Sequence, residues 1–157
     1  MVKKYMDETK KGFMQNIGDL SFKKIDETNY EFSIKVEEKF LNTGKIAHGG
    51  FIATIADTGM GNAAHIAAGN TRSVTVNLDI KFISAGKQGD ILVGKVEILK
   101  KTKTLVFLFC ELKCNDKIIT SASGVWKILA KRLMRTFYSP IRSGFSLFLF
   151  YTSNKIW

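Results

Sequence analysis

The chain of 157 residues lacks several common signatures of function. It has two cysteines, Cys110 and Cys114, but no C-x-x-C pair, no histidine pair at metal-ligand spacing and no glycine-rich phosphate loop. Two residues four apart on a strand have Cα atoms about 13 Å apart, too far for a disulfide. We therefore expect two reduced core thiols, and we predict neither a metal nor another cofactor.

Acidic residues are also scarce, with 14 against 24 lysines and arginines, so the formal net charge is +10. Five of the positive charges, and no acid, lie in the last 27 residues: Lys131, Arg132, Arg135, Arg142 and Lys155. The other lysines are scattered over predicted strands and turns, which is typical of a solvated surface and not of a groove that follows a phosphate backbone. We predict no nucleic-acid partner.

The two ends of the chain carry few functional signals. Charged residues follow Lys3-Lys4 where a secretory leader would have an apolar segment, so we expect a cytoplasmic protein. Residues 131–157 are rich in Arg, Ser and Phe, and their apolar segment 145–151 is too short to span a bilayer. A lipid- or partner-binding segment and an extension without structure of its own both stay open, although no membrane association is expected. We expect one domain over residues 1–130 and a basic, aromatic extension over 131–157.

Hydrophobic periodicity predicts a mixed α and β domain with an antiparallel sheet. A short amphipathic helix is expected at 5–17 and a long buried helix at 50–67. Five strands are expected from alternation or apolar content, after a first strand at 19–24: residues 31–37, 74–82, 91–99, 105–110 and 118–129. In the strand at 74–82, the apolar side chains are expected on one face: Val74, Val76, Leu78, Ile80 and Phe82.

The helix expected at 50–67 has one unusual residue, Asp57, among Ala, Gly and Ile. At about 100° per residue, Asp57 shares a face with small residues, and the isoleucines lie on the opposite side. The small residues are Gly50, Ala53, Gly61 and Ala64, and the isoleucines are Ile52, Ile55 and Ile66. Burying an unpaired carboxylate costs several kcal/mol. We therefore infer that Asp57 serves chemistry and not packing.

His48-Gly49-Gly50 open this helix, where the first N–H groups have no intrahelical acceptor. Such donors carry partial positive charge and stabilise an oxyanion in acyl transfer. Asp57 lies about 10 Å beyond Gly50 along the axis, too far to act on a carbonyl held there. The two groups meet if two helices run antiparallel across a twofold axis, so the sequence predicts a dimer with two composite sites.

Asn42, His48-Gly49-Gly50 and Asp57 together resemble the hotdog-fold acyl-CoA thioesterases of the phenylacetate-pathway type, over about Phe13 to Leu129. The resemblance implies an α+β hotdog fold, an antiparallel sheet wrapped around one long central helix. It also implies that the Gly50 amide polarises the thioester carbonyl and that Asp57 of the other subunit acts as base or nucleophile. Asn42 and Thr75 would position the water.

The chain departs from the family after Phe82-Ile83, where Ser84-Ala85 replaces the frequent Arg-Pro. A phosphate-binding arginine is therefore missing, and recognition of the CoA nucleotide differs or is weaker. The candidate substrate-binding residues are Gly49, Lys81, Phe82 and Ser84.

Two candidates keep alternative roles at this point. His48 is either a general base or an anchor of the loop through a backbone hydrogen bond. Asn42 either caps the loop or binds the water or the thioester.

The function predicted from these residues is hydrolysis of an acyl-CoA to a free acid and CoA by a homodimer or a dimer of dimers. A non-catalytic acyl-CoA sensor and a hotdog dehydratase are the alternatives. The acyl group itself is not determined by the sequence.

Overall fold

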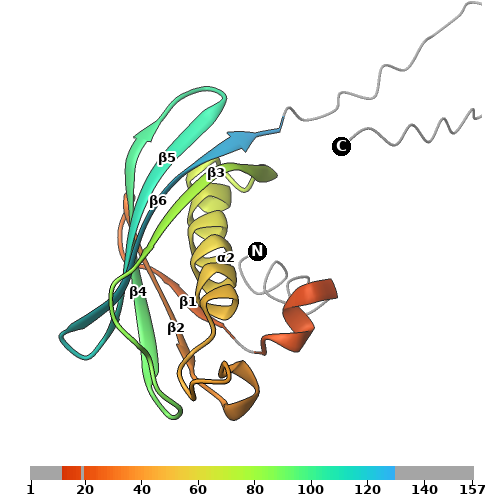
Figure 1. Cartoon of the computed structure of the whole chain (residues 1–157). Coiled ribbons are helices and arrows are strands. Elements are labelled where there is room, and N and C mark those ends of the chain that lie inside the picture. Colours follow the sequence, from red (N-terminus) through yellow and green to blue (C-terminus); the bar gives the residue numbers. More distant parts are fainter. Residues whose placement is uncertain (1–11, 19, 130–157) are drawn as a thin grey trace, which may run out of the picture.

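The structure is a computed structural model that describes residues 12–18 and 20–129. One long helix, α2 (Gly49–Ala67), lies against one face of a curved six-stranded antiparallel sheet (Figure 1). The strands are β1 (Ser21–Lys24), β2 (Asn29–Lys35), β3 (Ser73–Phe82), β4 (Ile91–Lys101), β5 (Leu105–Cys114) and β6 (Lys117–Ile128). Two short 3₁₀ helices, η1 (Gly12–Asn16) and η2 (Glu38–Phe40), precede β1 and α2. The strand order is β1-β2-β4-β5-β6-β3, which places β3 at one edge of the sheet.

This order of elements confirms the predicted α+β architecture, and the arrangement of one helix against a curved sheet is that of the hotdog fold. The predicted helix and strands are all present, with β4 and β5 extending to Lys101 and Cys114. The described part of the helix expected at 5–17 is the shorter η1. Residues 1–11, Asp19 and 130–157 lie outside the described residues, so the division of the chain at residue 130 stays a prediction.

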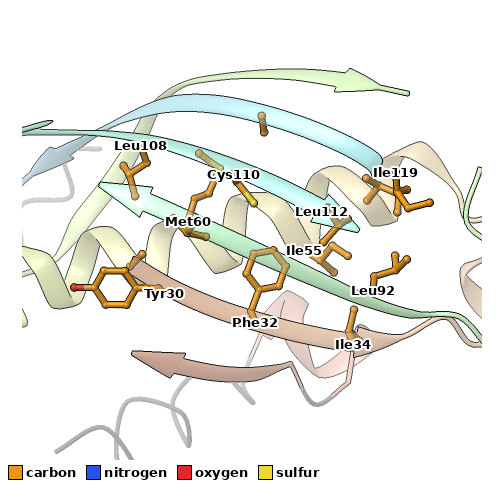
Figure 2. Packing of buried hydrophobic residues seen from close by; sticks show 14 of the residues in the cluster. Tyr30, Phe32, Ile34, Ile55, Met60, Leu92, Leu108, Cys110, Leu112 and Ile119 are labelled. Atoms are coloured by element: carbon orange, nitrogen blue, oxygen red, sulfur yellow. The ribbon is translucent and has the colours of Figure 1, made fainter. Parts of the chain in front are cut away.

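The isoleucine face of α2 packs on the sheet as expected, with Ile52 and Ile55 buried and Ile66 partly buried. Figure 2 shows Ile55 and Met60 of the helix facing side chains that project from the strands. Both cysteines are free, and burial raises the pKa of the Cys110 thiol to about 12. The predicted reduced thiols are therefore confirmed. No helix of the described residues is long and apolar enough to cross a membrane.

Phe32 is the contact that fixes the distance between helix and sheet. Its buried ring lies between Gly59 of α2 and Gly94 of β4, and a Cβ at either glycine would overlap the ring (Figure 2 shows Phe32 in the core). Glycine inside a helix costs about 1 kcal/mol relative to alanine. The close approach of the ring explains why glycine occupies both positions.

We predict that Gly94→Ala lowers the free energy of unfolding by about 1 to 3 kcal/mol, because the new methyl group overpacks the core against Phe32. Gly86→Ala is the matched control, since its Cβ would find only ordinary contacts with Ala47 and Leu92, at 3.5 and 3.6 Å. In a denaturant double-mutant cycle, Phe32→Leu should recover part of the Gly94→Ala loss. Strictly additive losses would show that the ring and the glycine are not coupled.

Candidate active site

A β-bulge in β3 turns Thr75 toward the helix. Thr75 pairs with Trp126 and Leu78 pairs with Gly124, with a register shift between Thr75 and Asn77. Trp126 is buried and faces α2, where its ring nitrogen lies 3.3 Å from the Cβ position of Gly61. Because a bulge adds one residue, Thr75 and Leu78 point to the same side of the sheet although their numbers differ in parity.

The bulge corrects the predicted alternation along β3. Leu78 and Ile80 are partly buried as expected, but Val74 and Val76 are exposed. The prediction that all five apolar residues share one face was wrong, because strict alternation ends at the bulge.

Asp57 accepts a hydrogen bond of 2.8 Å from the Thr75 hydroxyl. The carboxylate comes from the small-residue face of α2 and the hydroxyl from the edge strand, so the site joins the two elements. In the single chain Asp57 is half-buried. The expectation of a fully buried carboxylate therefore does not hold for one subunit, since this part of α2 faces the sheet edge and not the sheet centre.

His48 is the N-cap residue of α2, and its Nδ1 accepts a hydrogen bond of 2.8 Å from the Gly50 N–H. An Nδ1 that accepts this bond carries no proton, so the ring acts here as a cap. The Gly50 N–H, predicted to hold the thioester oxygen, is thus already engaged by His48. Among the described residues, the Gly49 N–H has no hydrogen-bond acceptor.

A cavity of about 290 Å³ opens beside the start of α2 and contains four of the predicted site residues, Asn42, Gly49, Phe82 and Ser84. The Phe82 ring lies 3.5 Å from the position that a Gly49 Cβ would take. The wall is completed by Ile52 of α2, by residues of the loops before α2 and β4, and by β6; besides Ile52 these residues are Ile46, Ala47, Ile83, Ala85, Gly86, Ile119 and Thr120. Sequence reasoning missed the β6 wall, because nothing in the sequence signals that β6 passes the helix start.

Asn42 shapes the loop that forms this cavity. Its side-chain oxygen accepts hydrogen bonds from the N–H groups of Gly44, at 2.9 Å, and Ile46, at 3.3 Å. The loop-capping role left open for Asn42 is therefore present. Its amide nitrogen has no acceptor among the described residues, which leaves one donor on a residue that lines the cavity.

Other predicted residues lie elsewhere. Lys81 forms an exposed ion pair of 2.6 Å with Asp79 and does not line the cavity. The second histidine of the chain, His65, lies near the end of α2, and its Nδ1 is 3.0 Å from the Thr71 carbonyl oxygen.

Comparison with known proteins identifies the family. The profile of the thioesterase superfamily matches residues 44–120. An inferred esterase of Pseudomonas aeruginosa, PA0474, is 31% identical over 97 residues, which are 61% of this chain and 72% of that protein. Human acyl-coenzyme A thioesterase 13 is 33% identical over 88 residues, 55% of this chain and 63% of that protein, so the match covers less than two thirds of it. The structure of zebrafish thioesterase superfamily member 2 superimposes with a TM-score of 0.73 at 25% identity, over 81% of this chain and 95% of that one.

The superfamily profile and the relatives named as esterase and acyl-coenzyme A thioesterase place this hotdog domain among the thioester hydrolases. The chain is a member of the thioesterase superfamily. The Asn42, His48-Gly49-Gly50 and Asp57 motif lies in or next to the matched segment, and the predicted family is confirmed.

We predict that His48→Ala lowers the free energy of unfolding by about 1 kcal/mol, because α2 loses its side-chain cap. His48→Asn should keep most of the stability, since asparagine is a preferred N-cap residue. The turnover of His48→Asn distinguishes the two roles of His48. If His48 is only a cap, the turnover rate stays within about tenfold of that of the unmutated protein. If His48 is a general base, the rate falls at least about a hundredfold. Urea unfolding and thioester turnover measure the two effects.

Proposed function

We propose that the protein hydrolyses an acyl-CoA thioester to a free acid and CoA. The observation that carries the proposal is the pairing of a cavity at the start of α2, where the Gly49 N–H is open, with a hydroxyl-bonded Asp57 on the same helix. The name of the human relative, an acyl-coenzyme A thioesterase, supports CoA as the carrier of the acyl group. The alternatives of a sensor or a dehydratase have no comparable support in the geometry.

The thioester oxygen is held by the Gly49 amide. The Gly50 N–H would first have to leave His48 Nδ1, whereas the Gly49 N–H needs no such change. Gly49 also lines the cavity, and Gly50 does not. The partial positive charge of the helix start adds to the polarisation of the carbonyl. The Asn42 amide nitrogen is a second donor for the oxygen or for the water.

Asp57 acts in one of two ways. As a base, it takes a proton from water while the water oxygen attacks the thioester carbon. As a nucleophile, its carboxylate attacks that carbon directly. On the first route the tetrahedral intermediate expels the CoA thiolate, which takes up that proton. On the second route the thiolate leaves and takes a proton from solvent, and water then cleaves the mixed anhydride on Asp57 to release the free acid and restore the carboxylate. The Thr75 hydroxyl fixes the orientation of the carboxylate, and Thr75 occupies the inner face of β3 because of the bulge. Asp57 lies about 12 Å along the axis from Gly49, so it cannot serve a carbonyl held by Gly49 of its own chain.

A second copy of the chain, paired along β3, completes each site. β3 is a ten-residue edge strand whose Val74, Val76 and Phe82 side chains are exposed. Long apolar edge strands are normally covered. A twofold axis perpendicular to the sheet at β3 pairs the strands antiparallel, keeps both helices on one face and runs them in opposite directions. Asp57, bonded to β3, is then carried toward the helix start of the other subunit.

Two lysines near the cavity can meet CoA phosphates in place of the missing arginine. Lys87 follows Gly86 of the cavity wall and forms a β-bridge with Ile46, and the Lys117 ammonium donates to the Ala85 carbonyl at 3.1 Å.

Asp57→Asn should lower kcat/KM at least about a hundredfold, because the base or nucleophile is lost while the shape is kept. Free-thiol release from a panel of acyl-CoAs measures the rate, and light scattering checks that the assembly is unchanged. Asp79→Asn is the matched control, since Asp79 on β3 bonds only to Lys81 among the described residues. Binding of acyl-CoA without turnover by the unmutated protein would favour the sensor.

Gly49→Pro should lower kcat about a hundredfold or more, because proline removes the backbone N–H assigned to the oxyanion. Proline is favoured at the first position of a helix, and His48 already has φ −63° and ψ 135°, which a following proline allows. The fold should therefore persist. Gly49→Ala keeps the N–H, and its Cβ would find ordinary contact with Phe82, so it should stay within about tenfold. Equal activity of the two variants would remove Gly49 from the mechanism.

Shared sites can be tested by co-expressing Asp57→Asn and Gly49→Pro chains with different tags and purifying the mixed dimer. One of its two sites then combines an intact Gly49 with an intact Asp57, so about half of the unmutated activity should return. No recovery would show that each site lies within one chain.

A further inference from the structure

Thr120 is a buried polar side chain that the proposed mechanism does not use. It lies on β6 and is 1% exposed, and its hydroxyl has no hydrogen-bond partner among the described residues. Buried hydroxyls are normally satisfied, because an unpaired one has lost its water without compensation. Such a group needs an explanation, and its place in the fold provides one.

Thr120 lines the same cavity as Gly49. In the sheet it pairs with Phe82 of β3 on one side and with Leu112 of β5 on the other, and Leu112 belongs to the core. Directly paired residues point to the same face, so Thr120 faces the interior next to the Phe82 ring that contacts Gly49. The Thr120 side chain is thus part of the cavity wall. Its hydroxyl oxygen itself has almost no exposed surface in the free chain, so a rotation about χ1 has to turn the hydroxyl toward a ligand.

The depth of Thr120 separates it from the reacting carbonyl. Gly49 is partly exposed, whereas Thr120 is almost fully buried. A thioester held at Gly49 keeps its CoA portion toward solvent, so the acyl group extends inward past Phe82. The hydroxyl therefore meets the acyl group and not the thioester.

We propose that Thr120 is a specificity-determining residue that hydrogen-bonds a hydroxyl or oxo group on the acyl portion of the substrate. A threonine hydroxyl both donates and accepts, so either group satisfies it. The cavity of about 290 Å³ has room for such a group, since a cavity of about 150 Å³ holds a benzene ring. This inference rests on the proposed function for the thioester chemistry, and it narrows the acyl group to the oxygenated class.

The test compares acyl-CoA pairs that differ by one hydroxyl: hexanoyl with 3-hydroxyhexanoyl, and benzoyl with its three ring-hydroxylated forms. The unmutated protein should prefer at least one hydroxylated member, and Thr120→Val should reduce that preference about tenfold, the effect of one buried neutral hydrogen bond. Thr120→Ser keeps the hydroxyl and should keep the preference. Thr120→Val without ligand should be at least as stable to heat as the unmutated protein, because no bond of the free chain is lost.

Three outcomes would overturn the inference. Equal turnover of the two acyl-CoAs in every pair means that the protein does not recognise a hydroxyl on the acyl group. An equal loss on both members of a pair places the Thr120 hydroxyl at the thioester carbonyl. A clear loss of thermal stability in Thr120→Val shows that the hydroxyl has a partner within the folded protein.

Binding separates this inference from the proposed function. The dissociation constants of each pair, measured by calorimetry on Asp57→Asn and on the double variant Asp57→Asn/Thr120→Val, do not depend on turnover. If Thr120→Val removes a hydroxyl preference in binding and the unmutated protein hydrolyses none of the acyl-CoAs, the proposed hydrolysis is contradicted and the role of Thr120 is supported. Turnover by the unmutated protein without any hydroxyl preference would support the proposed hydrolysis and contradict the role of Thr120.

Discussion

The packing of one helix against one face of the sheet is the constraint on which the rest of the structure depends. α2 has a bulky face, which includes Ile52 and Ile55, and a face of small residues that carries Asp57. Burial of each isoleucine contributes about 2 kcal/mol relative to exposure, so the bulky face determines how the helix is rotated. The Phe32 ring between Gly59 and Gly94 then sets how closely the helix approaches. Asp57 is left beside β3 as a consequence of that packing, and no separate interaction is needed to bring it there.

Much of this arrangement could be predicted from the sequence because it depends on local periodicity. The isoleucine spacing predicted the rotation of α2, and the alternation of Phe32 and Ile34 with polar residues predicted a strand with one wet face. The order of elements followed from the same patterns. The position of β3 at the edge could not be predicted this way, because pairing between distant strands is not encoded in the spacing of any one strand.

The site was predictable in its residue types but not in its contacts. His48, Gly49, Gly50 and Asp57 were identified by spacing, yet which glycine amide is open depends on the direction of the His48 ring. The bulge that brings Thr75 to Asp57 lies in the pairing of β3 with β6. An alternating pattern within one strand does not show where its pairing register with a neighbouring strand shifts. The Thr120 hydroxyl was missed for the same reason, since its lack of a partner follows from the pairing of β6 with both neighbours.

The direction of α2 connects the chemistry to the assembly. The open N–H groups of a helix occur at its start, and a sheet-covered helix has its accessible small-residue face along its side. Asp57 on that face is separated from the start of its own helix by about two turns of rigid structure, and no side-chain rotation closes such a gap. A second helix running the opposite way would bring its carboxylate to the open N–H of the first helix, and its own open N–H to the carboxylate of the first. The exposed β3 edge and the Asp57–Thr75 hydrogen bond lie on the side where that second helix would pack, so in the proposed dimer one surface would serve both assembly and catalysis.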